Sequence, residues 1–334
     1  IQDTASTSTL VALVCARERT SGHAAARGGM QDGSPPRTLY TSADAHSSVL
    51  KAALLAGFGR DHVRSVAVDA ARALEPAALA AAIDADRAAG MRPCAIVATS
   101  GTTATTAFDP LAACAEIARR HGMWLHVDAA MAGSAMLLPE CRPLWRGVEH
   151  ADSIVLNPHK WLGATFDCSV YLVRDEQHLV RVMSTNPSYL RTAADETARN
   201  YRDWGIALGR RFRALKLWSL IRTHGTRRLE RRLRRDLDNA QWLAAQVAAT
   251  PPWRLVAPVQ LQTVSLRHEP AGMTVEQLDA HTLGWVQRVH DSGAAWFTPA
   301  QLDGRWFVRV SIGALATERA DVAAAWQAMQ AAAG

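Results

Sequence analysis

WLHVDAAMAGSA at residues 124–135, followed by DSIVLNPHKWLGATFDCS at 152–169, decides the fold of this chain. Each stretch contains a short apolar run, Met123–Val127 and Ser153–Leu156, bounded by polar or turn residues. Runs of this length and composition predict buried strands of a parallel sheet. Ligands of such sheets bind beyond the carboxyl ends of the strands. Asp128 and Lys160, which follow the two runs, are therefore expected at a functional site.

A carboxylate and an amine at this place indicate a pyridoxal phosphate site. Lys160 would form the Schiff base, because a buried lysine in an apolar, partly cationic pocket has a lowered pKa and becomes a nucleophile. Asp128 would keep the pyridine nitrogen protonated, since an opposite charge favours the charged form. The ordinary alternatives are a lysine that extends from a strand end into solvent and an aspartate that caps a helix or lies on the surface.

The same motifs carry a family resemblance. HVDAA at 126–130 together with NPHKW at 157–161 resembles the group II pyridoxal-phosphate-dependent decarboxylases, most closely the aromatic L-amino-acid decarboxylases. The resemblance extends over nearly the whole chain, from Ile1-Gln2 to the terminal helix. It implies the α/β fold of the PLP-dependent transferases (fold type I), with a mainly parallel sheet in a large domain and a small α+β C-terminal domain. It also implies a homodimer with shared active sites.

The resemblance assigns further cofactor contacts. Ala5 and Ser6, at the start of a predicted helix, would hold the cofactor phosphate, which suits the free N–H groups and dipole of a helix N-terminus. His46 would stack on the ring and help to orient the substrate carboxylate, and Thr103 would contact the cofactor near its phenolic oxygen. The plainer interpretations are a capped surface helix, a structural histidine and the turn chemistry of Gly-Thr-Thr.

Residues next to Asp128 and Lys160 are also assigned by the resemblance. Ala130 matches a small residue that lets the cofactor ring lie flat. Asn157 resembles a phosphate or second-shell ligand. His159 favours the aromatic enzymes, since histidine decarboxylases tend to carry serine beside the lysine. Met131 departs from the family, which usually has an aromatic residue there.

Tyr189 lies in a segment, Ser184–Asp203, that lacks periodicity and is predicted to be a long loop and a mobile lid. In the resembled family a tyrosine at this place is the acid that protonates Cα after carbon dioxide leaves, a role that suits a phenol. Relatives with phenylalanine there tend toward oxidative deamination. The alternative is an aromatic side chain that packs on the protein surface.

The motif GRRFR at 209–213 resembles a segment near the phosphate, so Gly209 and Arg210 are candidate cofactor contacts. The alternative is a solvated, basic helix start. A further run of arginines at 227–235 could indicate nucleic acid. Leucines at four-residue spacing instead place these arginines on the solvent face of one helix, so we expect no nucleic-acid partner.

Composition adds few constraints. The net charge of +6 over 334 residues does not by itself require nucleic acid. Five scattered cysteines form no metal or redox spacing and indicate reduced thiols, hence a cytoplasmic protein; no metal is expected. No apolar run is long enough to cross a membrane. The chain starts at Ile1, and the resembled enzymes carry a substantial region before this point, which could hold a targeting signal.

Alternating strands and helices through residue 175 predict a doubly wound sheet. We expect a large domain at 1–225 and a small domain at 226–334. The strands predicted in the small domain are Thr263–Arg267, Ala294–Thr298 and Phe307–Ile312, and its helices are Thr226–Val247, Val275–Ser292 and Glu318–Ala333.

The expected reaction is decarboxylation of an aromatic L-amino acid (DOPA, tryptophan, tyrosine or phenylalanine) to its amine, a step of carboxylic acid metabolism. The sequence does not select among these substrates, because part of the substrate pocket comes from the N-terminal region in the family. Alternatives are a histidine or glutamate decarboxylase, an aromatic aldehyde synthase, and a truncated homologue without catalytic activity.

Overall fold

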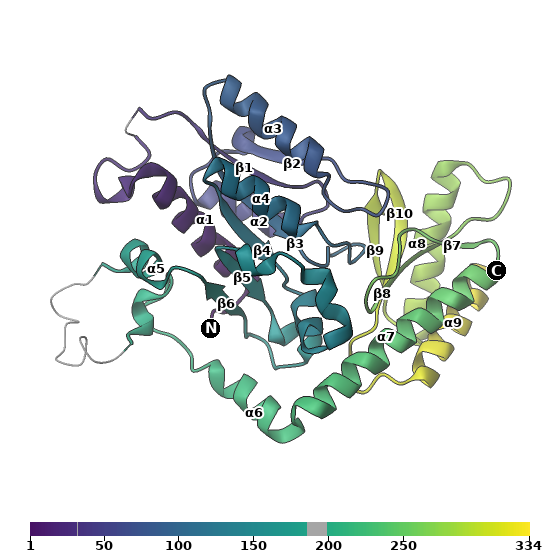
Figure 1. Cartoon of the computed structure of the whole chain (residues 1–334). Coiled ribbons are helices and arrows are strands. Elements are labelled where there is room, and N and C mark those ends of the chain that lie inside the picture. The colour runs from purple at the N-terminus through teal and green to yellow at the C-terminus, as the bar shows by residue number, and fades with distance from the viewer. Residues whose placement is uncertain (32, 186–198) are drawn as a thin grey trace.

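The computed structural model describes residues 1–31, 33–185 and 199–334. These residues form two sheets with helices around them (Figure 1). The first sheet has the order β2-β1-β3-β4-β5-β6. Its strands are β1 (Arg37–Ser42), β2 (Val63–Val66), β3 (Arg92–Thr99), β4 (Trp124–Asp128), β5 (Ser153–Leu156) and β6 (Val170–Val173). All neighbours run parallel except β6, which pairs antiparallel with β5 at the edge.

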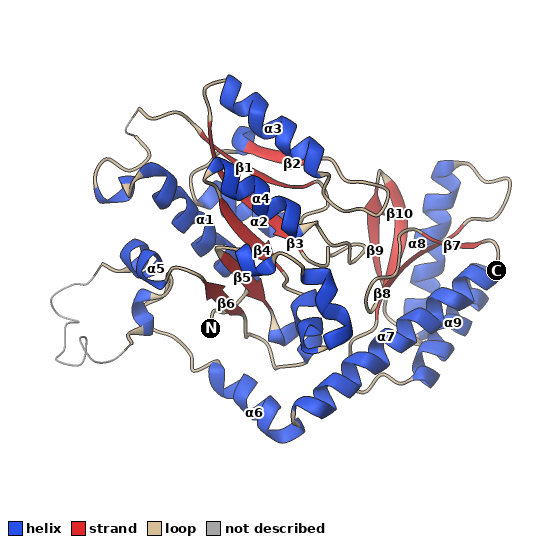
Figure 2. Cartoon of the chain, viewed as in Figure 1, coloured by secondary structure: helices blue, strands red, loops and turns tan. Residues whose placement is uncertain are grey.

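Helices cover both faces of this sheet (Figure 2). One face packs against α1 (Ala5–Ser21), α2 (Ser47–Leu55) and α5 (Glu176–Met183), and the other against α3 (Pro76–Ala88) and α4 (Leu111–His121). Alternate residues of β3 enter the two cores: Ala95 and Val97 one, Ile96 and Ala98 the other. Coverage of both faces explains why the central strands are apolar throughout.

The second sheet has the order β7-β8-β10-β9 and is antiparallel. Its strands are β7 (Trp253–Leu255), β8 (Thr263–His268), β9 (Thr298–Leu302) and β10 (Arg305–Ser311), packed with α8 (Val275–Ser292) and α9 (Arg319–Ala333). Trp253 contacts Trp285 and Trp326 edge to face in this core. Such aromatic contacts add to the free energy gained from burial of the rings.

The strand predicted at Ala294–Thr298 is wrong: only Thr298 lies in a strand, and β9 continues to Leu302. The apolar residues before it are held by His290 instead, whose ring stacks on Trp296 and accepts the N–H of Phe297. A two-residue turn, Asp303-Gly304, joins β9 to β10, and both residues have positive φ. Asp-Gly is the sequence signal for this hairpin turn.

Helix α7 (Thr226–Ala249) connects the two cores, while α6 (Ala214–His224) before it buries none of its residues. Leu233 of α7 lies in the first core, and Leu243 and Val247 lie in the second. The buried Asp236 accepts a hydrogen bond from Nε1 of Trp161, in the segment after β5. Because one helix belongs to both cores, the division at residue 225 stays a prediction.

His126 generates a test of the buried sheet. Its ring is fully buried on β4, with Nδ1 at 2.9 Å from Ser153 Oγ, and burial lowers its pKa to about 4. The unfolded chain binds this proton near pH ~6.5. Stability is therefore expected to fall as pH decreases from about 6.5 toward about 4, by about 2 kcal/mol over the first ~1.5 pH units.

Urea unfolding at about pH 7 and about pH 5 measures this loss. His126→Gln should be less sensitive to pH than the wild type, whereas His150→Gln, which changes an exposed histidine, should keep the full loss. An equal loss in His126→Gln would show that other groups cause it.

Candidate active site

A pocket of about 250 Å³ lies at the carboxyl ends of β4 and β5. Asp128 ends β4, and Lys160 follows β5 by four residues, so parallel pairing of these strands brings the two together. The residues that line the pocket are Thr4, Ala5, Ser6, His46, Ser48, Thr99, Gly101, Thr103, Asp128, Ala130, Met131, Asn157, His159, Lys160 and Phe166. Every predicted cofactor-binding residue except Gly209 and Arg210 is among them.

Lys160 lies in a single π-helical turn, Pro158–Leu162, that departs from helical geometry at the lysine itself. Its N–H donates to the carbonyl of Asn157 at 2.9 Å, and Gly163, with φ of 87°, closes the turn by donating to the carbonyl of Lys160. Lys160 as a whole residue is exposed. The protein atoms around its amine nevertheless desolvate that group. This desolvation lowers the pKa of Lys160, Asp128 opposes the shift, and the positive charge of Arg309 adds to it.

Asp128 is buried, and its Oδ1 accepts the N–H of Ala130 at 3.0 Å. Among the described residues, no basic side chain forms an ion pair with it. A buried carboxylate without a counter-ion is costly. The site therefore favours a cationic group of a ligand at Asp128.

The N-terminus of α1 forms another wall of the pocket. The side chain of Thr4 caps the helix by accepting the N–H of Thr7, while Ala5 and Ser6 face the pocket. The first N–H groups of a helix have no partner within the helix, and the helix dipole favours an anion there. Nearby, the buried side-chain oxygens of Asn157 and Thr99 have no hydrogen-bond partner within the described part of the chain.

These features test whether pyridoxal phosphate fits. The pocket offers an amine at Lys160, a carboxylate at Asp128 and a helix N-terminus at Ala5 and Ser6. The unpartnered side-chain oxygen of Asn157 can accept a hydrogen bond from a polar group of the ligand. An aldehyde, a protonated pyridine nitrogen and a phosphate match these groups one by one, so the residues present fit the cofactor.

His46 is held in one orientation by the start of α2. Its Nδ1 accepts the N–H of Ser48 at 3.1 Å and lies 2.8 Å from Ser48 Oγ. Because a backbone N–H can only donate, Nδ1 is the acceptor, and a neutral ring carries its proton on Nε2. Sequence analysis missed Ser48, which fixes this tautomer.

His159 and Phe166 form the outer part of the pocket. Nδ1 of His159 accepts the N–H of Cys168 at 2.9 Å, and its ring contacts Phe166 edge to face. Burial lowers the pKa of His159. Phe166, which sequence analysis also missed, is 70% exposed, so this aromatic surface is available to a ligand. Met131 lines the pocket as well.

The remaining predicted residues are not part of this pocket. Arg210 donates to the carbonyls of Tyr201 and Ile1 and to Oε1 of Gln2, so it holds the segment that leads into α1. A Cβ added at Gly209 would meet no described atom within 4 Å apart from its chain neighbours. Tyr189 lies outside the described residues.

Arg309 of β10 was also missed by sequence analysis. Its charge acts on Lys160, although it belongs to the second sheet. Its Nε is buried and finds no hydrogen-bond partner in residues 1–31, 33–185 and 199–334, and burial lowers the pKa of Arg309. The sequence signal is a charged residue between two buried valines of a strand, Val308 and Val310.

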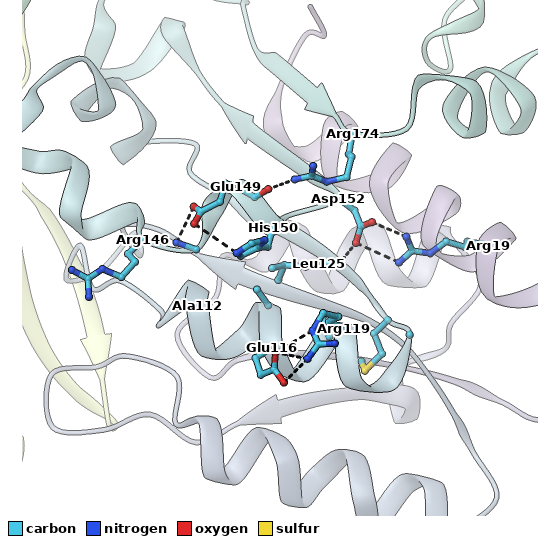
Figure 3. A pocket seen from close by; sticks show the side chains of 15 residues that line it. Arg19, Ala112, Glu116, Arg119, Leu125, Arg146, Glu149, His150, Asp152 and Arg174 are labelled. Carbon is cyan, nitrogen blue, oxygen red and sulfur yellow. Dashed lines mark hydrogen bonds and ion pairs between the residues drawn. The ribbon is translucent and has the colours of Figure 1, made fainter.

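A larger pocket of about 770 Å³ lies at the opposite end of the sheet (Figure 3). It lies where β4 begins and β6 ends, away from Lys160. Most of its charges are paired within the protein: Arg19 with Asp152, Arg119 with Glu116, and Arg174 with backbone carbonyls. It therefore offers fewer free groups for chemistry than the smaller pocket does.

Comparison with known proteins places the chain in a family. The family model described as the pyridoxal-dependent decarboxylase conserved domain matches residues 1–269. The chain belongs to this family. Family membership confirms the predicted resemblance and the predicted cofactor, pyridoxal phosphate.

Several relatives of the chain are decarboxylases of aromatic amino acids. It is 38% identical to tryptophan decarboxylase TDC1 of Camptotheca acuminata over 297 residues, which cover 86% of this chain and 59% of the relative. It is 38% identical to the aromatic-L-amino-acid decarboxylase of Drosophila lebanonensis over 338 residues, covering 100% of this chain and 81% of that one. It is also 36% identical to phenylacetaldehyde synthase of Arabidopsis thaliana, covering 99% and 67%.

Among solved structures, tryptophan decarboxylase of Oryza sativa with PLP and tryptamine superposes with a TM-score of 0.94 at 35% identity. The match covers 99% of this chain and 69% of that structure. This confirms the predicted α/β fold, fold type I. The chain spans 59% to 67% of the length of the first four curated relatives. No helix within the described residues is long and apolar enough to cross a membrane.

The pocket predicts different effects for its two central residues. Lys160→Ala should abolish the borohydride-stable adduct with pyridoxal phosphate, because no other lysine lines the pocket among the residues that the structure describes. Asp128→Asn should keep the adduct but retain the cofactor about tenfold less well, because a charge-assisted contact is lost. Mass spectrometry after reduction, together with cofactor release on dialysis, measures both effects. An adduct at the pocket of Lys160→Ala, or unchanged retention in Asp128→Asn, would contradict the assigned roles.

Proposed function

We propose that this protein decarboxylates an aromatic L-amino acid to its amine and carbon dioxide. The observation that carries the proposal is the pocket that brings Lys160, Asp128 and His46 together in a chain of the pyridoxal-dependent decarboxylase family. The tryptophan, tyrosine and aromatic-L-amino-acid decarboxylases among its relatives support the substrate class. Phe166 and Met131 support it too, because they offer aromatic and apolar surface to the substrate ring.

The proposed mechanism divides the work among the residues of the pocket. When bound, pyridoxal phosphate supplies a conjugated system that accepts the electrons released as the bond from Cα to the carboxylate breaks. Asp128 holds a proton on the ring nitrogen through its negative charge. Lys160, whose pKa is lowered, more readily presents an uncharged amine for covalent attachment. Ala5 and Ser6 bind the phosphate, and Thr103, Ala130, Asn157 and His159 line the cavity around the ring.

Arg309 is proposed to bind the substrate carboxylate. The guanidinium of Arg309 lies near enough to Lys160 to lower the pKa of the lysine. Arg309 has no acidic partner among the described residues. Arginine binds a carboxylate with two parallel hydrogen bonds, which would hold the scissile group in place. His46, fixed by Ser48, would orient the same group or the ring.

This role generates a prediction for Arg309→Gln. The KM for an aromatic L-amino acid should rise about tenfold or more, because a charge-assisted contact to the carboxylate is lost. Binding of the corresponding amine, which has no carboxylate, should change much less. Arg309→Lys should restore part of the affinity.

Steady-state kinetics with L-tryptophan and equilibrium binding of tryptamine measure the two effects. If Arg309→Gln weakens both ligands equally, the arginine supports the pocket rather than the carboxylate.

The second candidate function is an aromatic aldehyde synthase. The similarity to phenylacetaldehyde synthase of Arabidopsis thaliana favours it, while Tyr189, by the family resemblance, favours the amine. Aldehyde formation consumes dioxygen and water and releases carbon dioxide, ammonia and peroxide. Analysis of the products therefore distinguishes the two functions, and histidine and glutamate serve as further test substrates.

Tyr189→Phe tests the proposed proton donor. The substitution keeps the aromatic bulk and removes only the hydroxyl. Carbon dioxide release should continue while the yield of amine falls, and aldehyde, ammonia and peroxide should appear under oxygen. A product assay with phenylalanine, tyrosine, DOPA and tryptophan measures this change. An unchanged amine yield without aldehyde would show that another group protonates Cα.

We also propose a homodimer. Large apolar side chains are exposed on and just before α6: Ile206, Leu208, Phe212, Leu215, Trp218 and Ile221. Several large apolar side chains exposed within one short segment are typical of a protein interface. The cytoplasm is the proposed location, since all five cysteines are free and buried and none needs an oxidising compartment.

A further inference from the structure

A second site lies behind the turn that carries Lys160. A pocket of about 330 Å³ is lined by His224, Arg228, Leu229, Arg231, Arg232, Arg235 and Leu315. None of the described residues that line it is acidic. The arginines come from the run at 227–235. Their predicted place on the solvent face of a helix gives no role to so many positive charges.

The spacing of these arginines places them on one face of α7. Positions 228, 231, 232 and 235 are separated by three or four residues, the distance at which helix side chains are neighbours. Like charges at this spacing destabilise a helix. The other arginines of the run differ: Arg234 pairs with Glu140 and Glu230, and Arg227 does not line the pocket. The four arginines that line the pocket thus share one face of the helix.

Two of these arginines have no partner among the described residues. Arg228 and Arg231 are exposed, and neither forms a hydrogen bond or ion pair through its side chain. Their guanidinium groups keep all their donors available. Guanidinium groups bind phosphate and carboxylate oxygens with paired hydrogen bonds.

The inner wall of the pocket is fixed. The side chain of Arg232 is 9% exposed, donates to the carbonyls of Trp161 and Gly313, and lies 3.5 Å from Asp236. Arg235 contacts Glu318 and the carbonyl of Leu315. Even so, Nε of each of these two arginines is buried and has no hydrogen-bond partner among the described residues. Buried donors of this kind are rare unless a ligand or water satisfies them.

We propose that this pocket binds a small polyanion that carries phosphate groups. The two unpaired guanidinium groups of Arg228 and Arg231 match a ligand with two or more negative charges, and the cavity has the size of a small-ligand site. Such a ligand would relieve the repulsion along α7. Inorganic pyrophosphate and a nucleoside diphosphate share this chemistry. Only the nucleoside diphosphate has a base, to which Leu315 offers an apolar contact.

Calorimetric titration of the cofactor-saturated full chain with pyrophosphate tests the proposal, because saturation fills the phosphate position in the active site. We expect saturable binding at one site per chain. Arg228→Gln and Arg231→Gln should each weaken it about tenfold, the loss expected for a charge-assisted contact. Arg227→Gln, a matched change on the same helix outside the pocket, should bind like the wild type.

A second arm replaces pyrophosphate with ADP. Tighter binding of ADP, lost in Arg231→Gln, would assign the site to a nucleotide, and equal or weaker binding would assign it to inorganic phosphates. The proposal is overturned if no saturable binding occurs, or if Arg227→Gln weakens binding as much as Arg228→Gln and Arg231→Gln do. Equal weakening by all three substitutions would show that the affinity for the anion depends only on the net charge of the helix.

Discussion

The hydrogen bond from Trp161 to Asp236 connects the chemistry of this protein to its architecture. Trp161 follows Lys160 directly, and Asp236 lies in the middle of α7, the helix that joins the two cores. Burial raises the pKa of Asp236, whereas the indole N–H and the charge of Arg232 lower it. A buried, charged group of this kind adds little net stability but is costly if it loses its partners. The position of the lysine turn is therefore coupled to the position of the second sheet.

This coupling sets a charge of the second sheet near the lysine, although the described residues that line the pocket all lie between Thr4 and Phe166. The first sheet supplies Asp128 and Lys160 at adjacent strand ends, and β10 of the second sheet brings Arg309 toward the lysine. Gly313, just after β10, lies so close to the Trp161 ring that an added Cβ would be 3.2 Å from it. The tryptophan thus lies close to the segment that follows the strand carrying Arg309, and it also donates a hydrogen bond to α7.

Much of the fold could be predicted because it is specified locally. The strands at β3, β4 and β5 are short apolar runs bounded by polar residues, and the helices show caps and apolar stripes. Three-residue β7 was not predicted, because so short a strand has no period. The strand predicted at Ala294–Thr298 failed for another reason. The same apolar pattern also suits a segment that folds onto a neighbouring helix, as Phe297 and Trp296 do on His290.

The two sites differ in the same way, because some of their residues are specified locally and others are placed by tertiary packing. Asp128 and Lys160 could be found because strand order alone brings adjacent strand ends together. Arg309 could not, since its place depends on how the second sheet packs against the first. The arginines of α7 show the limit most clearly. Helical spacing correctly separated them from the leucines, yet it could not show that Arg232 turns inward to the carbonyl of Trp161 while Arg231 stays free. Only the tertiary contact converts a basic helix face into a cavity with a fixed inner wall, and this is why a charge pattern alone does not define a binding site.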